Sequence, residues 1–341
     1  MKPRTTSLLA AVLGLTLLIP AVSAAEDWPA VPPEEPPADW GPVSINFEEI
    51  DYPWPVHFLE LNRFGEKMLM AYMDIQPTGR ANGQTIVWQH GHNVYAEAYV
   101  DTYRILADAG FRIIAPDRIG YAKSSKALVP YDFGFVASNM KALIDHLELD
   151  EVAIVGHSMG GMVVSRFAMQ YPDVVTHVAM VNQIGLTDQR QSRPWSDPWA
   201  GEPGVQSYQS ILRSHQRYYP REWPPEQLKY VKRAYGQTLS GGYPHYARVR
   251  RLVGAMMYSD PVVYDWQHIT TKALVIGGEQ DLLADDFVAR ATHVHNELQN
   301  SALLLYPEVG HNPHVEISEQ FHADLIRFLV SDPEEPASEW R

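Results

Sequence analysis

The stretch that most constrains the fold is a strand, a sharp turn and a helix between residues 152 and 170. The apolar run Val152–Val155 leads directly into Gly-His-Ser-Met-Gly at 156–160, and a helical pattern continues to about Gln170. Gly-x-Ser-x-Gly in this setting is typical of a serine at the tip of a strained turn, where the flanking glycines leave room. Because the pentapeptide alone is common, the rest of the chain must decide its meaning.

Short apolar segments alternate with helical segments on both sides of this turn. We expect strands at 57–61, 67–75, 85–89, 111–115, 152–156, 175–181, 273–276 and 301–306, and helices at 99–109, 133–147, 159–170, 285–296 and 319–329. Most of these strands are apolar throughout, which is typical of a parallel sheet covered on both faces. The pattern therefore predicts an α/β fold with a mostly parallel eight-stranded sheet and helices on both faces.

This alternation breaks down between residues 185 and 268. The interval holds nine of the 18 tyrosines, four of the nine tryptophans and no phenylalanine, and it carries 11 Lys and Arg against 7 Asp and Glu. We expect a mainly helical cap here, inserted before the penultimate strand and between the two parts of a core at 57–184 and 269–331. Its positive excess could attract an anionic substrate, although surface arginines are more often solvated.

The two ends of the chain differ from the core in composition. Lys2 and Arg4 precede an apolar run at 8–22, and Val-Ser-Ala-Ala at 22–25 offers a cleavage site after Ala24 or Ala25. This predicts a signal peptide at 1–24 and a periplasmic or secreted mature protein without stable membrane insertion, the alternative being an uncleaved anchor. A proline-rich acidic arm is expected at 25–56 and an acidic tail at 332–341.

Composition excludes several classes of site and partner. The net charge of −14 argues against a nucleic-acid partner, whose phosphates require a basic face. The chain has no cysteine, so disulfides, thiolate metal ligands and cysteine nucleophiles are excluded. His90 and His92 form one His-x-His pair without further clustered ligands, so we expect neither a metal nor a cofactor.

A serine nucleophile needs a base, and the base needs an orienting group. In a parallel sheet such groups should follow strands directly, because active sites lie beyond the carboxyl ends of the strands. Asp281 follows the expected strand at 273–276, and His311 follows the last strand. The chain order Ser158, Asp281, His311 is the order expected when a serine nucleophile lies on a Gly-x-Ser-x-Gly turn between a strand and a helix.

Other positions compete with Asp281 for the role of the acid. Asp285 and Asp286 lie close by in the sequence. The alternative for both is a place at the start of a surface helix, where the helix dipole stabilises an acidic side chain. An acid could also follow the strand ending near Val181, but Asn182 and Gln183 stand there.

An oxyanion formed during acyl transfer needs fixed hydrogen-bond donors. The backbone N–H of Met159, at the start of a helix, is one candidate. The N–H of His92 is the other, because Gly91 permits a tight turn after the strand at 85–89. His157 is expected to pack beside the turn rather than act as a base.

Five ordered motifs resemble the α/β-hydrolase family in its capped branch, over about residues 57–329. They are His-Gly at 90–91, Ala-Pro-Asp-Arg-x-Gly at 115–120, Gly-x-Ser-x-Gly at 156–160, Gly-x-x-Asp at 278–281 and Gly-His at 310–311. The resemblance implies Ser158 as nucleophile, His311 as base, Asp281 as its orienting acid, and His92 and Met159 as oxyanion donors. It implies structural roles for Asp117 and Arg118.

The resemblance also narrows the chemistry. Epoxide hydrolases and haloalkane dehalogenases of this family use an aspartate where this chain has Ser158, and a serine favours acyl transfer to water. We therefore expect a carboxylic ester hydrolase acting through an acyl-enzyme on a small hydrophobic or aromatic ester. Other reactions of the same three residues remain alternatives: hydrolysis of a lactone, of an amide (as in an amidase or aminopeptidase) or of a carbon–carbon bond, and perhydrolysis. A low-turnover binding protein of the same fold is a further alternative.

Overall fold

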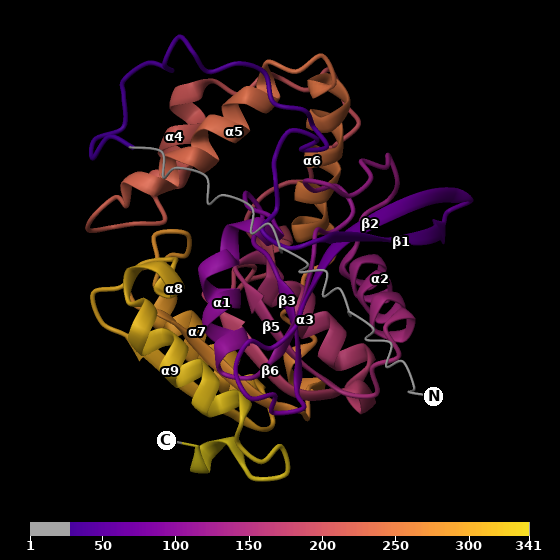
Figure 1. Ribbon diagram of the computed structural model, residues 1–341, viewed down its shortest axis with the longest axis vertical. Coiled ribbons are helices and arrows are strands. Elements are labelled where there is room, and N and C mark those ends of the chain that lie inside the picture. Colours follow the sequence, from indigo (N-terminus) through magenta and orange to yellow (C-terminus); the bar gives the residue numbers. More distant parts are fainter. Residues whose placement is uncertain (1–27, 341) are drawn as a thin grey trace, which may run out of the picture.

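The computed structural model describes residues 28–340 (Figure 1), and the expected signal peptide lies outside them. One eight-stranded sheet has the order β1-β2-β4-β3-β5-β6-β7-β8. Its strands are β1 (Val56–Arg63), β2 (Glu66–Ile75), β3 (Thr85–Gln89), β4 (Arg112–Pro116), β5 (Val152–His157), β6 (Val175–Val181), β7 (Lys272–Gly278) and β8 (Ser301–Tyr306). The pairs β1–β2 and β2–β4 are antiparallel and the others parallel, so the prediction of a mostly parallel eight-stranded sheet is confirmed.

Helices follow most of the strands and cover the sheet on both faces (Figure 1). They are α1 (Val100–Asp108), α2 (Phe133–His146), α3 (Met159–Gln170), α4 (Tyr208–Gln216), α5 (Leu228–Thr238), α6 (Tyr243–Ser259), α7 (Phe287–Glu297), α8 (Pro313–Glu316) and α9 (Ser318–Leu329). Short 3-10 turns are η1 (Ala96–Tyr99), η2 (Pro172–Val174), η3 (Gln189–Gln191), η4 (Pro225–Gln227), η5 (Trp266–His268) and η6 (Ala337–Glu339). Helix α7 starts two residues later than expected, because Asp286 is its N-cap and accepts a hydrogen bond from Ala289 N–H.

The sheet separates two apolar cores. Successive side chains of a strand point to opposite faces, so Val87 of β3 packs with α2 and α3, whereas Ile86 and Trp88 pack with α1 and α9. Both sets of side chains are buried, and the strand is therefore apolar at every position rather than at every second one.

The loops that carry the candidate site residues leave the same edge of the sheet. Parallel register aligns the ends of β5, β6 and β7, so Ser158, Asn182 and Asp281 follow neighbouring strands on one side. His311 follows β8 at the same edge. This edge faces the helices α4, α5 and α6 (Figure 1).

Helices α4 to α6 form the cap, which is inserted between β6 and the penultimate strand β7. Tyr208, Ile211 and Leu212 of α4 pack against Leu228 and Val231 of α5 in an apolar cluster of the cap's own. Helix α6 instead contributes to a core cluster of the sheet, so the cap is joined to the core along this helix.

Residues 28–55 run across the cap and the core as an extended arm. Trp40 is buried in the cap cluster with its ring edge-on to Tyr208, at a centroid distance of 5.8 Å. Further on, the carbonyl of Phe47 accepts a hydrogen bond of 2.6 Å from Lys123 of the core. The arm therefore contacts both parts. No helix in residues 28–340 combines the length and apolar character needed to cross a membrane.

One buried ion cluster ties the segment after α6 to the core. Arg166 of α3 donates to both oxygens of Asp260 at 2.9 Å and to Asp265 at 2.6 Å. Asp260 also accepts from Phe133 N–H at the start of α2. The guanidinium and the two carboxylates are each less than a quarter exposed.

Replacing Arg166 by methionine should lower the free energy of unfolding by about 2–4 kcal/mol, because it leaves two carboxylates largely buried without their cation. Urea unfolding measures the change. The control is Lys67→Met, which breaks a solvent-exposed pair with Glu60 and should cost less than about 1 kcal/mol. Similar losses of unfolding free energy in the two variants would contradict a stabilising role of the Arg166 ion cluster.

Candidate active site

Ser158 lies at the tip of a strained turn between β5 and α3. Its backbone has φ 58° and ψ −120°, in the region that side chains other than glycine rarely adopt. A Cβ atom at Gly156 would overlap the carbonyl oxygen of Gly160, and one at Gly160 would overlap the carbonyl oxygen of Gln89. Both glycines are therefore required for the close approach of β3, β5 and α3.

Asp281 and His311 form a buried hydrogen-bonded pair beside this turn. Asp281 Oδ2 lies 2.7 Å from His311 Nδ1, and Oδ1 accepts from Leu283 N–H at 2.9 Å. Burial alone would raise the pKa of Asp281, but the His311 ring and these hydrogen bonds outweigh it and hold the pKa below its usual value. The carboxylate is therefore ionised and fixes Nδ1 of His311 as a donor, which leaves Nε2 free to act as a base.

The structure brings Ser158, His311 and Asp281 together. Ser158 and His311 both line a small cavity of about 30 Å³, together with Gly91 and His92. The competing acids lie elsewhere: Asp286 caps α7, and both Asp285 and Asp286 are exposed.

Asn182 belongs to the site, although the sequence analysis noted it only as a position that lacks an acid. Its Nδ2 donates to Asp281 Oδ2 at 2.9 Å and to the carbonyl of Gly310 at 3.3 Å, and its Oδ1 accepts from Gly278 N–H. It thus joins the ends of β6 and β7 to the loop that carries His311. The sequence feature that could have indicated this role is a polar side chain directly after an apolar strand.

The loop after β3 is held against Ser158 by hydrogen bonds to its carbonyl groups. A Cβ atom at Gly91 would lie 3.3 Å from Ser158 Cβ. The carbonyl of Gly91 accepts from Arg118 at 2.9 Å and from His90 Nδ1 at 2.8 Å. Because a trans peptide is planar, fixing this carbonyl also fixes the His92 N–H in the opposite direction.

The two predicted oxyanion donors both lie next to Ser158. Met159 is the first residue of α3, so its N–H is one of those that a helix start leaves unpaired within the helix. His92 lines the small cavity with Ser158. The neighbouring Gly91 N–H donates to the Tyr99 hydroxyl at 3.0 Å and is therefore already used.

His90 is a structural residue in this arrangement. Its Nδ1 donates to Gly91, and its Nε2 accepts from Arg118 N–H, so neither nitrogen is left to bind a metal. Burial and the neighbouring Arg118 charge hold its pKa well below the usual value. In residues 28–340, no three His, Asp or Glu side chains are grouped to hold a metal ion.

A chain of hydrogen bonds through His157 connects the loops of the site. The Tyr99 hydroxyl donates to His157 Nδ1 at 2.7 Å, and His157 Nε2 donates to the carbonyl of His311 at 2.9 Å. Burial lowers the pKa of His157 to about 3, so the ring stays neutral. His157 therefore positions the backbone at His311, and nothing in the sequence pointed to its link with Tyr99.

The cap also contacts the candidate base. His311 N–H donates to the carbonyl of Tyr218 at 3.0 Å, and the Tyr218 ring lies over the imidazole at a centroid distance of 5.2 Å. The Tyr218 hydroxyl accepts from Asn93 at 2.8 Å. On the other side, Glu316 accepts from Gly310 N–H and Asn312 N–H.

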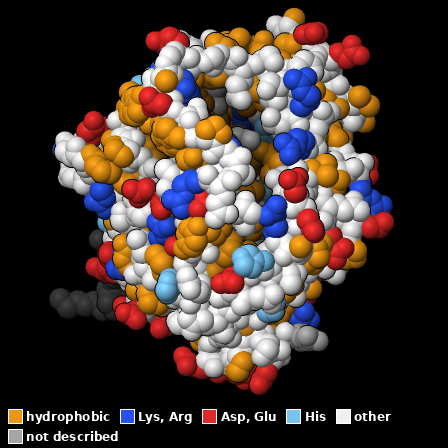
Figure 2. All heavy atoms as spheres, turned by 180° about the vertical axis from the view of Figure 1, so that it is seen from behind, with side chains coloured by type: hydrophobic (Ala, Val, Ile, Leu, Met, Phe, Trp, Pro, Cys, Tyr) orange, Lys and Arg blue, Asp and Glu red, His pale blue; other side chains and the backbone are white. Residues whose placement is uncertain are grey.

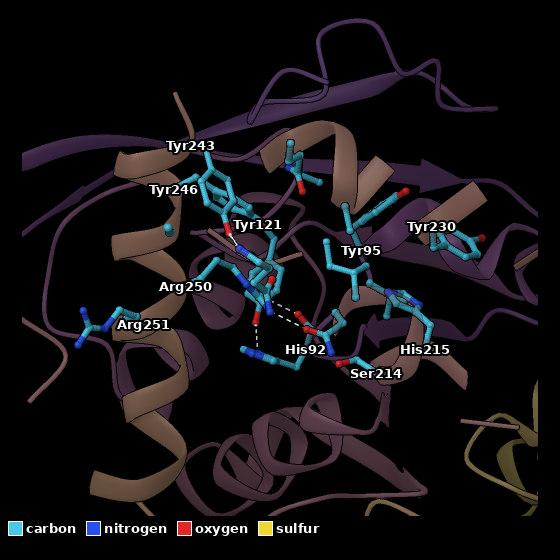
Figure 3. A pocket seen from close by; sticks show the side chains of 18 of the residues that line it. His92, Tyr95, Tyr121, Ser214, His215, Tyr230, Tyr243, Tyr246, Arg250 and Arg251 are labelled. Atoms are coloured by element: carbon cyan, nitrogen blue, oxygen red, sulfur yellow. Dashed lines mark hydrogen bonds between the residues drawn. The ribbon is translucent and has the colours of Figure 1, made fainter. Parts of the chain in front are cut away.

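A larger cavity of about 480 Å³ lies between the cap and the loop after β3 (Figure 3). The small cavity that contains Ser158 shares five lining residues with it: His92, Asn93, Val94, His215 and Tyr230. Tyr95, Tyr121, Tyr243 and Tyr246 also line it. The molecular surface is hollowed on the cap side (Figure 2). The two cavities together can hold a molecule much larger than the small one alone.

Comparison with known proteins identifies the class to which this fold and site belong. A profile described as the alpha/beta hydrolase fold matches residues 86–203. A probable hydrolytic enzyme of Pseudomonas aeruginosa has a structure with a TM-score of 0.81 and 32% sequence identity, covering 86% of this chain and 100% of that one. The chain belongs to the α/β-hydrolase family.

More distant relatives share parts of the chain. An uncharacterized protein of Mycobacterium tuberculosis is 28% identical over 284 residues, which is 75% of this chain and 77% of that protein. A haloalkane dehalogenase of Mycolicibacterium paratuberculosis is 30% identical over 157 residues, 45% of this chain and 51% of that enzyme. The structure of an esterase from Exiguobacterium antarcticum is similar with a TM-score of 0.65 and 17% sequence identity. The match covers 81% of this chain and 100% of the esterase chain, and at this identity it shows the fold alone.

Stability should depend on pH through Asp281. Its pKa is lower in the folded chain than the value of about 3.9 in an unfolded one, so the unfolded state binds the proton first as the pH falls. The stabilisation is therefore present above about pH 4 and is lost as the pH falls further.

The measurement is the free energy of unfolding of the wild type and of Asp281→Asn by urea titration between pH 3 and pH 7. We expect a difference that is largest at neutral pH and shrinks below about pH 4. Asp285→Asn is the matched control, because that side chain is exposed in the same loop region. A difference that does not change with pH would contradict the ionised Asp281–His311 pair.

Proposed function

We propose that this protein is a serine hydrolase that cleaves a carboxylic ester through an acyl-enzyme. The observation that carries the proposal is the buried Asp281–His311 pair beside Ser158 on a strained turn. Ser158 Oγ attacks the ester carbonyl while His311 Nε2 takes its proton, and His311 returns that proton to the leaving alcohol. Water, activated by the same histidine, then attacks the acyl-enzyme and releases the acid and Ser158.

The negative charge of the tetrahedral intermediates needs two donors. The N–H groups of His92 and Met159 are the proposed pair, since they flank Ser158 from the loop after β3 and from the start of α3. Arg118 supports the first by fixing the Gly91 carbonyl. Asp281 stabilises the imidazolium that His311 becomes in each half of the reaction.

The relatives support hydrolysis, and the residues favour attack by a serine over dehalogenation. The Pseudomonas aeruginosa relative is described as a probable hydrolytic enzyme, which supports hydrolysis in general. A dehalogenase reaction is disfavoured, because this chain has Ser158 at the position where haloalkane dehalogenases of the family use an aspartate nucleophile. The many tyrosines around the larger cavity favour a small substrate with a hydrophobic or aromatic part.

The nucleophile can be tested with a fluorophosphonate probe and a panel of aryl and alkyl esters, lactones and aminoacyl amides. Wild-type protein should be labelled at Ser158 and should hydrolyse esters fastest. Ser158→Ala should lose labelling and at least about 10³-fold in kcat while keeping its unfolding free energy, because the serine makes the covalent bond. Labelling or near-native turnover of that variant would refute the role of Ser158.

We also propose that the protein is exported. The support is the sequence alone: two basic residues, an apolar run at 8–22 and a small-residue site ending at Ala24 or Ala25. In a bacterial host, mature protein from the periplasm or medium should begin at Ala25 or Glu26. Leu17→Arg should leave uncleaved protein in the cell, because a charge interrupts the apolar run. Wild-type protein that keeps residues 1–24 would refute this proposal.

A further inference from the structure

The larger cavity contains cationic side chains and no acidic one. Its lining residues include Arg250 and Arg251 but neither Asp nor Glu. This composition is unusual for the chain, which has 41 acidic and 27 basic residues. Figure 3 shows Arg250 directed from α6 toward the loop that carries His92, whereas Arg251 points to the other side of the helix.

Arg250 is held by neutral acceptors only. Its guanidinium donates to the carbonyl of His92 and to Asn93 Oδ1, both at 2.7 Å, and lies 5.2 Å from the centre of the Tyr121 ring. A guanidinium has five N–H donors, and Arg250 also shares a hydrogen bond with the Tyr121 side chain, so two donors remain. Among the ion pairs within residues 28–340, none includes Arg250.

Three other partly buried arginines of this chain, by contrast, are paired with carboxylates. Arg233 lies 2.7 Å from Glu97, and Arg112 lies 2.7 Å from Asp74. Arg166 is held by two carboxylates. Arg250 differs from these three, because it is a half-buried cation that lines a cavity without Asp or Glu.

The surroundings of Arg250 do not supply a negative charge at neutral pH. Burial keeps the pKa of His92 well below its usual value and lowers that of His215 to about 4. Both rings are therefore neutral and add no charge to the cavity. Burial also raises the pKa of Tyr95 and of Tyr246. In a site with little water, an uncompensated cation binds an anion more strongly than it would at the surface.

Arg250 lies next to the reacting centre. It binds the carbonyl of His92, and the N–H of the same residue is a proposed oxyanion donor. The small cavity with Ser158 and the larger cavity with Arg250 share His92 and Asn93. A ligand anion on Arg250 would thus place the adjacent part of the same molecule at Ser158.

We propose that the substrate carries a carboxylate, which Arg250 binds in the larger cavity while Ser158 attacks the ester. This proposal rests on the proposed ester hydrolysis and names its substrate class: a half-ester of a dicarboxylic acid, or an ester whose alcohol bears a carboxylate. The free guanidinium donors suit the two oxygens of a carboxylate.

The test compares matched charged and neutral esters. One series places the charge on the acyl side: 4-nitrophenyl half-esters of dicarboxylic acids of four to eight carbons against 4-nitrophenyl alkanoates of the same length. The other places it on the alcohol side: 4-carboxyphenyl acetate against 4-methylphenyl acetate. In at least one series, kcat/KM should be about tenfold or more higher for the charged ester, and the ratio should fall with added salt.

Variants assign the preference to Arg250. Arg250→Gln should reduce the charged-to-neutral ratio about tenfold or more, and Arg250→Lys should retain part of it, because the charge remains. Any disturbance of the His92 loop lowers the rates of both esters and leaves their ratio unchanged. Arg248→Gln is the control, since Arg248 lies on α6, donates to the carbonyl of Pro198 and does not line the cavity.

Failure of this proposal differs from failure of ester hydrolysis. Turnover of neutral esters with no preference in either series, or a preference unchanged in Arg250→Gln, overturns the carboxylate site alone. If no ester is hydrolysed, calorimetry with Ser158→Ala and the half-esters still decides. Binding that Arg250→Gln weakens about tenfold or more supports the site, and binding equal for charged and neutral esters, or undetectable for both, overturns it.

Discussion

The close approach of three backbones at the Ser158 turn is the constraint on which the rest of this structure depends. Glycines at 156 and 160 let β5, α3 and the end of β3 come within contact, and the strained φ of Ser158 follows from that packing. The same approach places the His90–His92 loop beside Ser158. The backbone strain at Ser158 is thus maintained by the packing of the two apolar cores, one on each face of the sheet.

Around that turn, the site is built from buried groups that bind one another rather than solvent. Asn182 holds Asp281, Asp281 holds His311, and His157 holds the carbonyl of His311. On the other side, Arg118 holds the carbonyl of Gly91. Each of these bonds joins loops that leave different strands, so the site is rigid because the sheet edge is rigid. The cap supplies what the edge does not, namely the cavity wall and Arg250.

The sequence was most informative where local physics decides the outcome. The alternation of continuous apolar segments with helical segments, together with the turn at 156–160, was sufficient to predict the sheet. The rule that sites follow parallel strands pointed to Asp281 and His311. The roles of Asn182, Tyr99 and Tyr218 depend on contacts between residues far apart in the chain, which periodicity does not encode. Arg250 was one of 11 basic residues of the cap, and only the packing of α6 against the His92 loop distinguishes it from solvated arginines.

The contact between Tyr218 and His311 makes the cap part of the proposed catalytic site. Because the cap's Tyr218 carbonyl binds the backbone of the candidate base, the position of the cap and the position of the base are thermodynamically coupled. Coupling of this kind is reciprocal, so a molecule that fixes the cap also fixes His311. Binding energy gained far from Ser158 can thereby be used to align the proposed base.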